Sequence, residues 1–190
     1  MSVTGQGGAS PMHFLPTTLP GVFVVEMELR EDERGFFARS WCVTEFAAHG
    51  LDTGLAQCSV SYNKRRGTLR GMHFQADLHA EVKLVRCTAG VVYDVAVDLR
   101  PHSPTFRQWT ATELTAENRR ALYVPKGCGH GFQTLTAGAE VLYHMSEVYH
   151  AEAARGVRWN DPAFGIRWPL ADPFLSERDA AYADFLEPDL

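Results

Sequence analysis

The sequence predicts an all-β fold, a sandwich or barrel with a few short helices. Strand-like segments follow one another at spacings near ten residues, and Gly, Pro and Asn separate them. Residues 22–25, for example, form a β-branched and aromatic run directly behind Pro20 and Gly21. The expected strands are residues 22–25, 35–43, 55–62, 68–75, 82–88, 91–98, 108–113, 121–124, 131–135 and 140–147. Helical signals are short, at residues 45–49, a turn around 116–119, and 176–182.

The chain length fits one domain with a sizeable core, because the sequence has 190 residues, of which 45% are hydrophobic. Residues 1–11 have neither the basic flank nor the apolar stretch of a secretory signal, so we expect a flexible tail before a single domain at 12–190. No apolar run reaches the roughly 18–20 residues that cross a bilayer. We expect a cytoplasmic protein without a membrane partner.

The charge balance argues against nucleic acid as a partner, since the formal net charge is −5. A basic run at Lys64-Arg65-Arg66 is either a solvated loop or a contact for a small ligand that carries phosphate. The four cysteines contain no CxxC pair, which favours reduced thiols over a zinc site or a disulfide framework.

Three polar residues stand on otherwise apolar rows of the predicted strands. Alternation places His73, Lys83 and Asp94, each from a different strand, among apolar neighbours on one face. Burying such groups is costly unless they are paired or functional. The pattern therefore indicates a pocket inside the sandwich or barrel.

Several motifs in fixed order carry a resemblance to a known family. Three segments are GTLRGMHFQ at 67–75, VPKGCGHGF at 124–132 and VLY at 141–143. The others, in chain order, are DERGFF at 32–37, KLVR at 83–86, YDVAVD at 93–98, SPTF at 103–106, LTAEN at 114–118, RGVRWNDP at 155–162 and LSERD at 175–179. With them the chain resembles the dTDP-4-dehydrorhamnose 3,5-epimerases from about Leu19 to Asp184. The resemblance implies a cupin-like double-stranded β-helix, which is a jelly-roll barrel.

The resemblance also implies an activity: inversion of C3, C5 or both in a dTDP-linked 4-keto-6-deoxyhexose during deoxysugar biosynthesis. The C4 ketone acidifies the protons on C3 and C5. Inversion then needs a base, an acid on the opposite face, and a group that stabilises the enolate oxygen. Because the ketone of the substrate activates these carbons, we expect no metal and no organic cofactor.

The resemblance assigns catalytic roles to five residues. His73 is the base, and a neutral imidazole suits this role because its unperturbed pKa is about 6.5. Asp179 holds the other ring nitrogen of His73. Tyr143 is the opposing acid, Lys83 lies near the C4 oxygen, and His130 lines the same pocket.

Five further residues match substrate-binding positions of the family. Arg34 and Arg70 match positions that contact the diphosphate, where a guanidinium can bind two oxygens at once. Phe37 and Tyr149 either flank the nucleotide base and the sugar or pack in the core. Gln57 matches a polar position near the nucleotide.

Three points stay open from the residues alone. Strict alternation puts Arg70 and His73 on opposite faces, so both reach one ligand only if a bulge or twist occurs near Gly71. Asp94 either supports a pocket histidine or makes a structural hydrogen bond. Family members often carry Asn where Ser59 stands here, which bears on nucleotide contacts.

Other functions compete with this interpretation. One is a metal-dependent, dioxygenase-like cupin, although Lys83 in the pocket would repel a divalent cation. Its ligands would be His73, Gln75 and His130, with His79 or Glu81 also available. A second is a C3-only or C5-only epimerase of another nucleotide sugar. A third is a sugar-binding relative without activity, against which the retained catalytic set argues.

The family resemblance finally implies a homodimer. Family members pair strands and lend residues across the interface, and such pairing also covers the exposed edges of open sheets.

Overall fold

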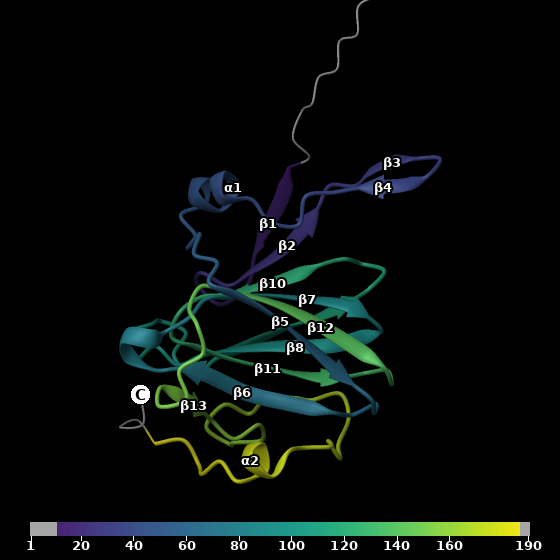
Figure 1. Cartoon of the computed structure of the whole chain (residues 1–190). Coiled ribbons are helices and arrows are strands. Elements are labelled where there is room, and N and C mark those ends of the chain that lie inside the picture. The colour runs from purple at the N-terminus through teal and green to yellow at the C-terminus, as the bar shows by residue number, and fades with distance from the viewer. Residues whose placement is uncertain (1–10, 187–190) are drawn as a thin grey trace, which may run out of the picture.

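Two antiparallel sheets lie one above the other in the computed structural model, which describes residues 11–186 (Figure 1). The six-stranded sheet has the order β1 (Met12–Pro16), β2 (Phe23–Met27), β10 (Ala121–Val124), β7 (Lys83–Ala89), β12 (Ala139–Met145) and β5 (Gln57–Asn63). The five-stranded sheet has the order β13 (Ala154–Gly156), β6 (Leu69–Gln75), β11 (Cys128–Thr134), β8 (Val91–Asp98) and β9 (Trp109–Thr115). The prediction of an all-β fold is confirmed.

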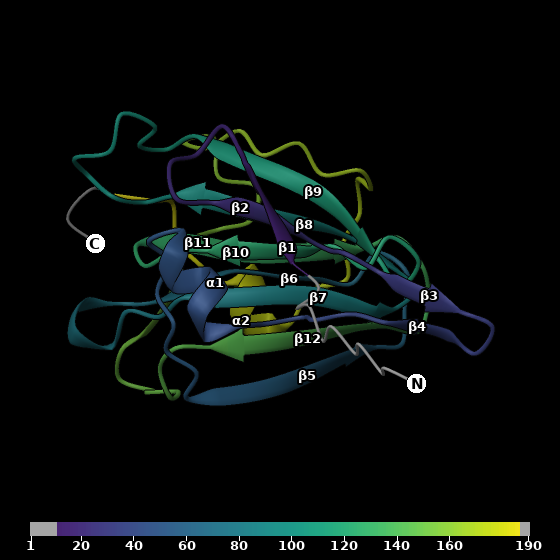
Figure 2. The same cartoon turned by 90° about the horizontal axis from the view of Figure 1, so that it is seen from above.

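The remaining elements are short. A hairpin of β3 (Arg30–Asp32) and β4 (Gly35–Phe37) projects beyond the two sheets (Figure 2). The helices are α1 (Val43–Ala48), the 3₁₀ turn η1 (Asp77–His79) and α2 (Glu177–Ala180). The described part of the chain contains no helix with the length and apolarity that spanning a membrane takes. The predicted tail at 1–11 lies, except for Pro11, outside the described residues.

One prediction about the N-terminal part is wrong, and the strand β1 was not predicted. The strand expected at 35–43 ends at Phe37. Beyond it the chain turns into α1, because the Glu45 carboxylate accepts hydrogen bonds from Arg39 (2.6 Å) and from the Met12 amide (2.7 Å). Phe46 of α1 is thereby buried against the outer face of the first sheet. The edge strand β1 was not expected, and its Pro16 is tolerated because β1 pairs only with β2.

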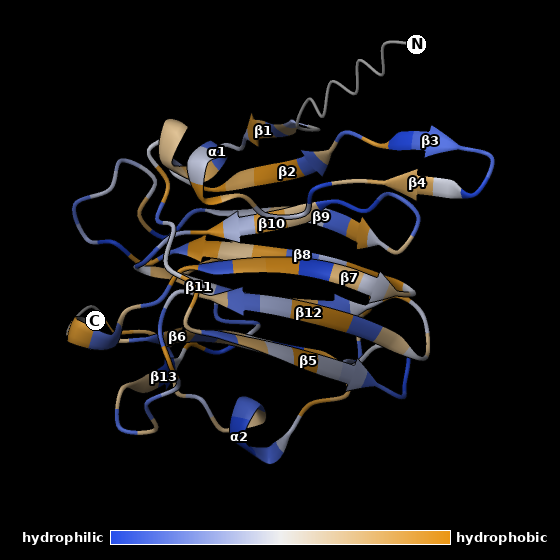
Figure 3. Ribbon diagram, turned by 45° about the horizontal axis from the view of Figure 1, so that its top comes forward, coloured by the Kyte–Doolittle hydropathy of each residue, from blue (hydrophilic) through white to orange (hydrophobic). Residues whose placement is uncertain are grey.

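The core lies between the sheets and leaves one end of the sandwich polar. Hydrophobic residues concentrate in the long strands, whereas β3 and many connecting loops are hydrophilic (Figure 3). The fully buried Val85 and Val141 of the first sheet pack with Phe132 of the second. Lys83 stands two residues before Val85 on the same face of β7. The row of side chains that faces the other sheet therefore changes from apolar to polar at this end of the strand. This polar end is where the pocket predicted from alternation lies.

A bulge in β6 brings Arg70 and His73 to the same face. His73 lies opposite His130 in β11, but Arg70 lies opposite Phe132, so three steps along β6 match two along β11. Gly71 has φ +142°, and a Cβ there would lie 2.5 Å from the Cα of Gly131, so only glycine fits. The question that alternation left open is therefore answered: a bulge at Gly71 puts Arg70 and His73 on one face.

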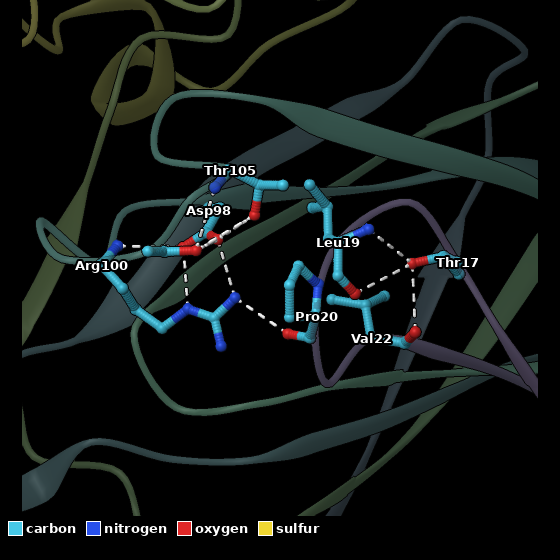
Figure 4. Close-up of polar contacts among 8 residues, drawn as sticks. Thr17, Leu19, Pro20, Val22, Asp98, Arg100 and Thr105 are labelled. Atoms are coloured by element: carbon cyan, nitrogen blue, oxygen red, sulfur yellow. Dashed lines mark hydrogen bonds and ion pairs between the residues drawn. The ribbon is translucent and has the colours of Figure 1, made fainter.

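A buried carboxylate fixes the loop that follows β8. Asp98 is fully buried and accepts hydrogen bonds from Arg100 (2.7 and 2.8 Å), Ser103 (2.5 Å) and Thr105 (2.7 Å). Arg100 also donates to the carbonyl of Pro20 (2.9 Å), which ties the turn before β2 to this corner (Figure 4). Burial alone raises the pKa of Asp98, but these donors outweigh it and lower the pKa from 3.8 to about 2.

Replacing Asp98 with Asn should lower the free energy of unfolding by about 2 kcal/mol at pH 7, since one pKa unit corresponds to about 1.4 kcal/mol. A carboxyl with a lowered pKa stabilises the fold above its ordinary pKa, and this contribution is lost as the pH falls toward the folded value. Urea unfolding at a series of pH values measures the difference in free energy of unfolding between wild type and variant. This difference should be constant above pH 4 and shrink toward pH 2. The exposed Asp172→Asn is the control. A difference independent of pH would contradict this account.

Candidate active site

A cavity of about 420 Å³ opens between the two sheets at their polar end. Its walls come from both sheets and from the segment that follows β12. The five-stranded sheet supplies Arg70, His73 and His130, the six-stranded sheet supplies Gln57, Lys83 and Tyr143, and the following segment supplies Tyr149. The structure thus brings most of the predicted site residues together.

His73 is held by a buried carboxylate. Its Nε2 lies 2.7 Å from Asp179 Oδ1, and Asp179 itself is almost fully buried, whereas His73 is partly open to the cavity. Burial raises the pKa of Asp179, but the bonds and charge of His73, with the Gly71 amide (3.4 Å), lower it overall. An ionised carboxylate only accepts hydrogen bonds, so Nε2 carries the proton and Nδ1 remains as the basic nitrogen.

The short helix α2 places Asp179. Ser176 caps its N-terminus by accepting a hydrogen bond from the Asp179 amide (3.1 Å). The segment before it is fixed to the start of β6, because Phe174 donates to the Gly67 carbonyl (2.8 Å) and Leu69 donates to that of Phe174 (2.9 Å). The histidine and its carboxylate are therefore brought together from segments 106 residues apart.

His130 forms a second, deeper pair with Asp94. Its Nε2 lies 2.9 Å from Asp94 Oδ1, and both side chains are buried. The open question about Asp94 is thereby answered: it supports a pocket histidine. The His130 ring also meets the Tyr143 ring edge to face, with centroids 5.8 Å apart.

Tyr143 faces the cavity from the sheet opposite His73. Burial raises the pKa of its hydroxyl, and the nearby Asp94 raises it further. The hydroxyl is therefore protonated at neutral pH and able to donate a proton.

Lys83 is anchored on two sides. Its Nζ donates to the backbone carbonyl of His73 (3.1 Å) and lies 3.0 Å from Glu81 Oε1. Gln75 donates to the second oxygen of Glu81 (3.2 Å). Sequence reasoning considered Glu81 only as a metal ligand. Its position two residues before Lys83 was the signal that could have indicated this ion pair.

The cavity wall is rich in cations although the protein is acidic. Arg70, whose Nε donates to Asn63 (2.8 Å), is joined by Arg155 and Arg178. A hydrogen bond to Tyr149 raises the pKa of Arg178. Sequence reasoning missed Arg155 and Arg178, although both stand inside quoted motifs. A wall of this charge suits an anionic ligand.

Gln57 and Tyr149 meet at the mouth of the cavity, where Gln57 Oε1 accepts a hydrogen bond from the Tyr149 amide (3.1 Å). Tyr149 is more than half exposed, which leaves its ring open to a ligand. Ser59, at the position where relatives often carry Asn, also lines the cavity.

Arg34 and Phe37 do not reach the cavity of their own chain. Both belong to the projecting β3–β4 hairpin (Figure 1). The Arg34 side chain is 89% exposed and forms an ion pair with Asp32, and Phe37 is 73% exposed. The structure thus leaves these two predicted binding residues outward-facing.

The cavity does not match the ligand set of a metal-dependent cupin. His73 and His130 each pair with a different carboxylate, and the Lys83 cation shares their cavity. Within residues 11–186, the group of His, Cys, Asp or Glu side chains that could share an ion lies elsewhere.

Comparison with known proteins agrees with the fold. The family model described as dTDP-4-dehydrorhamnose 3,5-epimerase matches residues 16–187. The dTDP-4-dehydrorhamnose 3,5-epimerase of Salmonella typhimurium is 44% identical over 172 residues, which cover 90% of this chain and 93% of that protein.

Solved structures agree as well. The crystal structure of dTDP-4-dehydrorhamnose 3,5-epimerase from Bacillus anthracis, with TDP and PPi bound, has a TM-score of 0.89 and 40% identity, and covers 92% of this chain and 100% of that one. A 3'-monoepimerase from Streptomyces bikiniensis in complex with dTDP-quinovose has a TM-score of 0.82 and 33% identity, covering 89% and 86%. This chain therefore has the cupin-like fold and belongs to the dTDP-4-dehydrorhamnose 3,5-epimerase family.

Proposed function

We propose that the protein inverts C3, C5 or both in a dTDP-linked 4-keto-6-deoxyhexose, by removing a proton beside the C4 ketone and returning one from the opposite face. The observation that carries this proposal is that His73 and Tyr143 enter one cavity from opposite sheets. A sugar between them would present one face to a base and the other to an acid.

His73 performs the first step. Its Nδ1 takes the proton from C3 or C5, and the electrons of the C–H bond form an enolate with the C4 oxygen. Asp179 fixes the ring tautomer and stabilises the imidazolium that results. The Lys83 ammonium, held by Glu81, supplies a cation for the developing enolate oxygen.

Tyr143 completes the inversion. Its hydroxyl gives a proton to the carbon from the opposite face, and the enolate electrons form the new C–H bond. The phenolate that remains regains a proton from solvent, and His73 releases its proton to solvent. The chemistry needs only these residues and the ketone of the substrate.

Charge and stacking support a nucleotide diphosphate as the carrier of the sugar. Arg70, Arg155 and Arg178 give the wall a positive charge that suits a diphosphate. Gln57 and Tyr149 stand at the mouth, where a base would lie. The structures of the relatives with TDP and with dTDP-quinovose bound support the same nucleotide.

The test is incubation with dTDP-4-keto-6-deoxyglucose in deuterated water, followed by NMR. We expect an epimerised product that carries deuterium at the inverted carbons. Label at C3 alone would identify the monoepimerase reaction of the Streptomyces bikiniensis relative. Failure to exchange with this substrate and with other nucleotide-linked 4-keto sugars would contradict the proposal.

We further propose a homodimer in which the β3–β4 hairpin of each chain completes the cavity of its partner. The hairpin projects from the body of the protein and exposes Arg34 and Phe37. Because an isolated chain gains nothing from this exposure, it favours contact with a second chain. Light scattering should give a mass of twice 21.1 kDa. A monomer in solution would contradict this part of the proposal.

Mixed dimers test whether the hairpin acts on the partner. One chain carries Arg34→Ala with Phe37→Ala, and the co-expressed second chain carries His73→Ala. If the hairpin serves the partner, the mixed dimer has one intact site, and its activity should clearly exceed that of either variant homodimer. If the hairpin serves its own cavity, both sites carry a defect and no gain is expected.

A cytoplasmic location also belongs to the proposal. All four cysteines are free thiols, which suits a reducing compartment. Cell fractionation tests the location, and recovery of the protein outside the cytoplasmic fraction would contradict it.

A further inference from the structure

A group of side chains that could hold a metal ion lies on two segments joined by Gln75 of the cavity wall, outside the proposed chemistry. His79 belongs to η1, and His150 and Glu152 follow Tyr149 in the segment after β12. One ligand atom from each of the three side chains lies within 4.8 Å of the other two. The two imidazole rings are stacked with centroids 3.6 Å apart, so the two histidines already lie side by side.

The donor set suits a transition metal. Two imidazoles and a carboxylate are ligands of Zn²⁺, with Zn–N distances of about 2.0–2.1 Å, whereas Mg²⁺ prefers oxygen ligands alone. His150 Nδ1 lies 3.3 Å from Glu152 Oε1, and its Nε2 lies 3.8 Å from Glu147. Small rotations of partly exposed side chains would bring the ligand atoms to coordination distance.

The backbone that carries these ligands is already fixed. Buried Gln75 donates to the His79 carbonyl (3.2 Å) and to the Val148 carbonyl (3.0 Å), and it accepts a hydrogen bond from the His150 amide (2.6 Å). One side-chain amide thus joins the two segments that supply the ligands. Prior ordering of this kind lowers the entropic cost of binding an ion.

We propose that His79, His150 and Glu152 bind one divalent transition-metal ion, with Zn²⁺ as the representative. The ion links η1 to residues 146–153 and so holds Tyr149 at the mouth of the cavity. It takes no part in proton transfer, because the three ligands are separate from the His73–Asp179 pair.

Calorimetry on the full chain, free of any affinity tag and treated with a chelator, tests the site. We expect one equivalent of Zn²⁺ to bind and Mg²⁺ not to bind. His150→Gln and Glu152→Gln should each weaken Zn²⁺ binding by roughly tenfold or more, because the loss of even an outer-shell partner of a metal site has an effect of this size. The exposed His102→Gln is the matched control and should bind as the wild type does.

A further variant separates this site from the catalytic one. His73→Ala should keep full Zn²⁺ affinity, and Zn²⁺ should slow amide hydrogen exchange in residues 146–153 of the wild type. The proposal is overturned if the wild type binds no Zn²⁺, if His150→Gln and Glu152→Gln leave the affinity unchanged, if His73→Ala removes binding, or if exchange in residues 146–153 stays the same.

Discussion

Replacing His73 with Ala is expected to lower deuterium exchange at C3 and C5 by roughly 10²–10⁴-fold, the range that a positioned general base contributes. The His73 imidazole lines the cavity and is more exposed than that of His130, and a buried, ionised carboxylate holds its Nε2. Alanine removes the base and leaves Asp179 buried without its partner. NMR of the sugar protons in deuterated water measures the rate directly.

The loss of exchange must be separated from a loss of structure. Thermal unfolding should show that His73→Ala is folded, at a lower melting temperature than wild type because Asp179 loses its partner. Binding of dTDP should stay close to wild type, because the binding cations are unchanged. The exposed His102→Ala should keep the wild-type rate. Exchange at the wild-type rate in a folded His73→Ala would show that another group is the base.

Replacing Tyr143 with Phe should give the second large effect, and a different kind of effect. Proton removal by His73 should continue, so deuterium still enters at C3 or C5. Inversion should fall by roughly 10²-fold or more, because phenylalanine has no proton to return from the opposite face. NMR of the recovered sugar should therefore show labelled substrate with its original configuration.

The ratio of inversion to exchange is the quantity that identifies the acid. The change from Tyr to Phe keeps the ring that contacts His130, so the packing of the cavity is preserved. A Tyr143→Phe variant that exchanges and inverts in the wild-type ratio would remove Tyr143 from the role of acid. If the rates of exchange and inversion both fell by the same factor, the ratio would also stay unchanged, and Tyr143 would act before the enolate forms.

Local patterns in the sequence predicted the strands that line the cavity and the face that several residues occupy. Alternation correctly placed Lys83 and His73 inside, since both side chains line the cavity between the sheets. It failed for Arg70, since an extra residue at the Gly71 bulge reverses the alternation. Alternation left open whether that bulge existed, because only the family resemblance required Arg70 and His73 to serve one ligand.

Long-range contacts could not be predicted from periodicity. Asp179 lies 106 residues from His73 and on a four-residue helix, so only the family resemblance connected the two. The strand β1 was missed because Pro16 and its short length are poor strand signals. Arg155 and Arg178 were missed because a surface arginine has no pattern of its own.

The account depends on His73 and Tyr143 facing opposite sides of one sugar, and a crystal structure with an unreactive dTDP-linked hexose tests this directly. We expect His73 Nδ1 roughly 3–3.5 Å from C3 or C5 on one face, with the Tyr143 hydroxyl on the other face of the ring. A complex in which both side chains lie on the same face, or in which the His73 ring turns away from the sugar, would contradict the account.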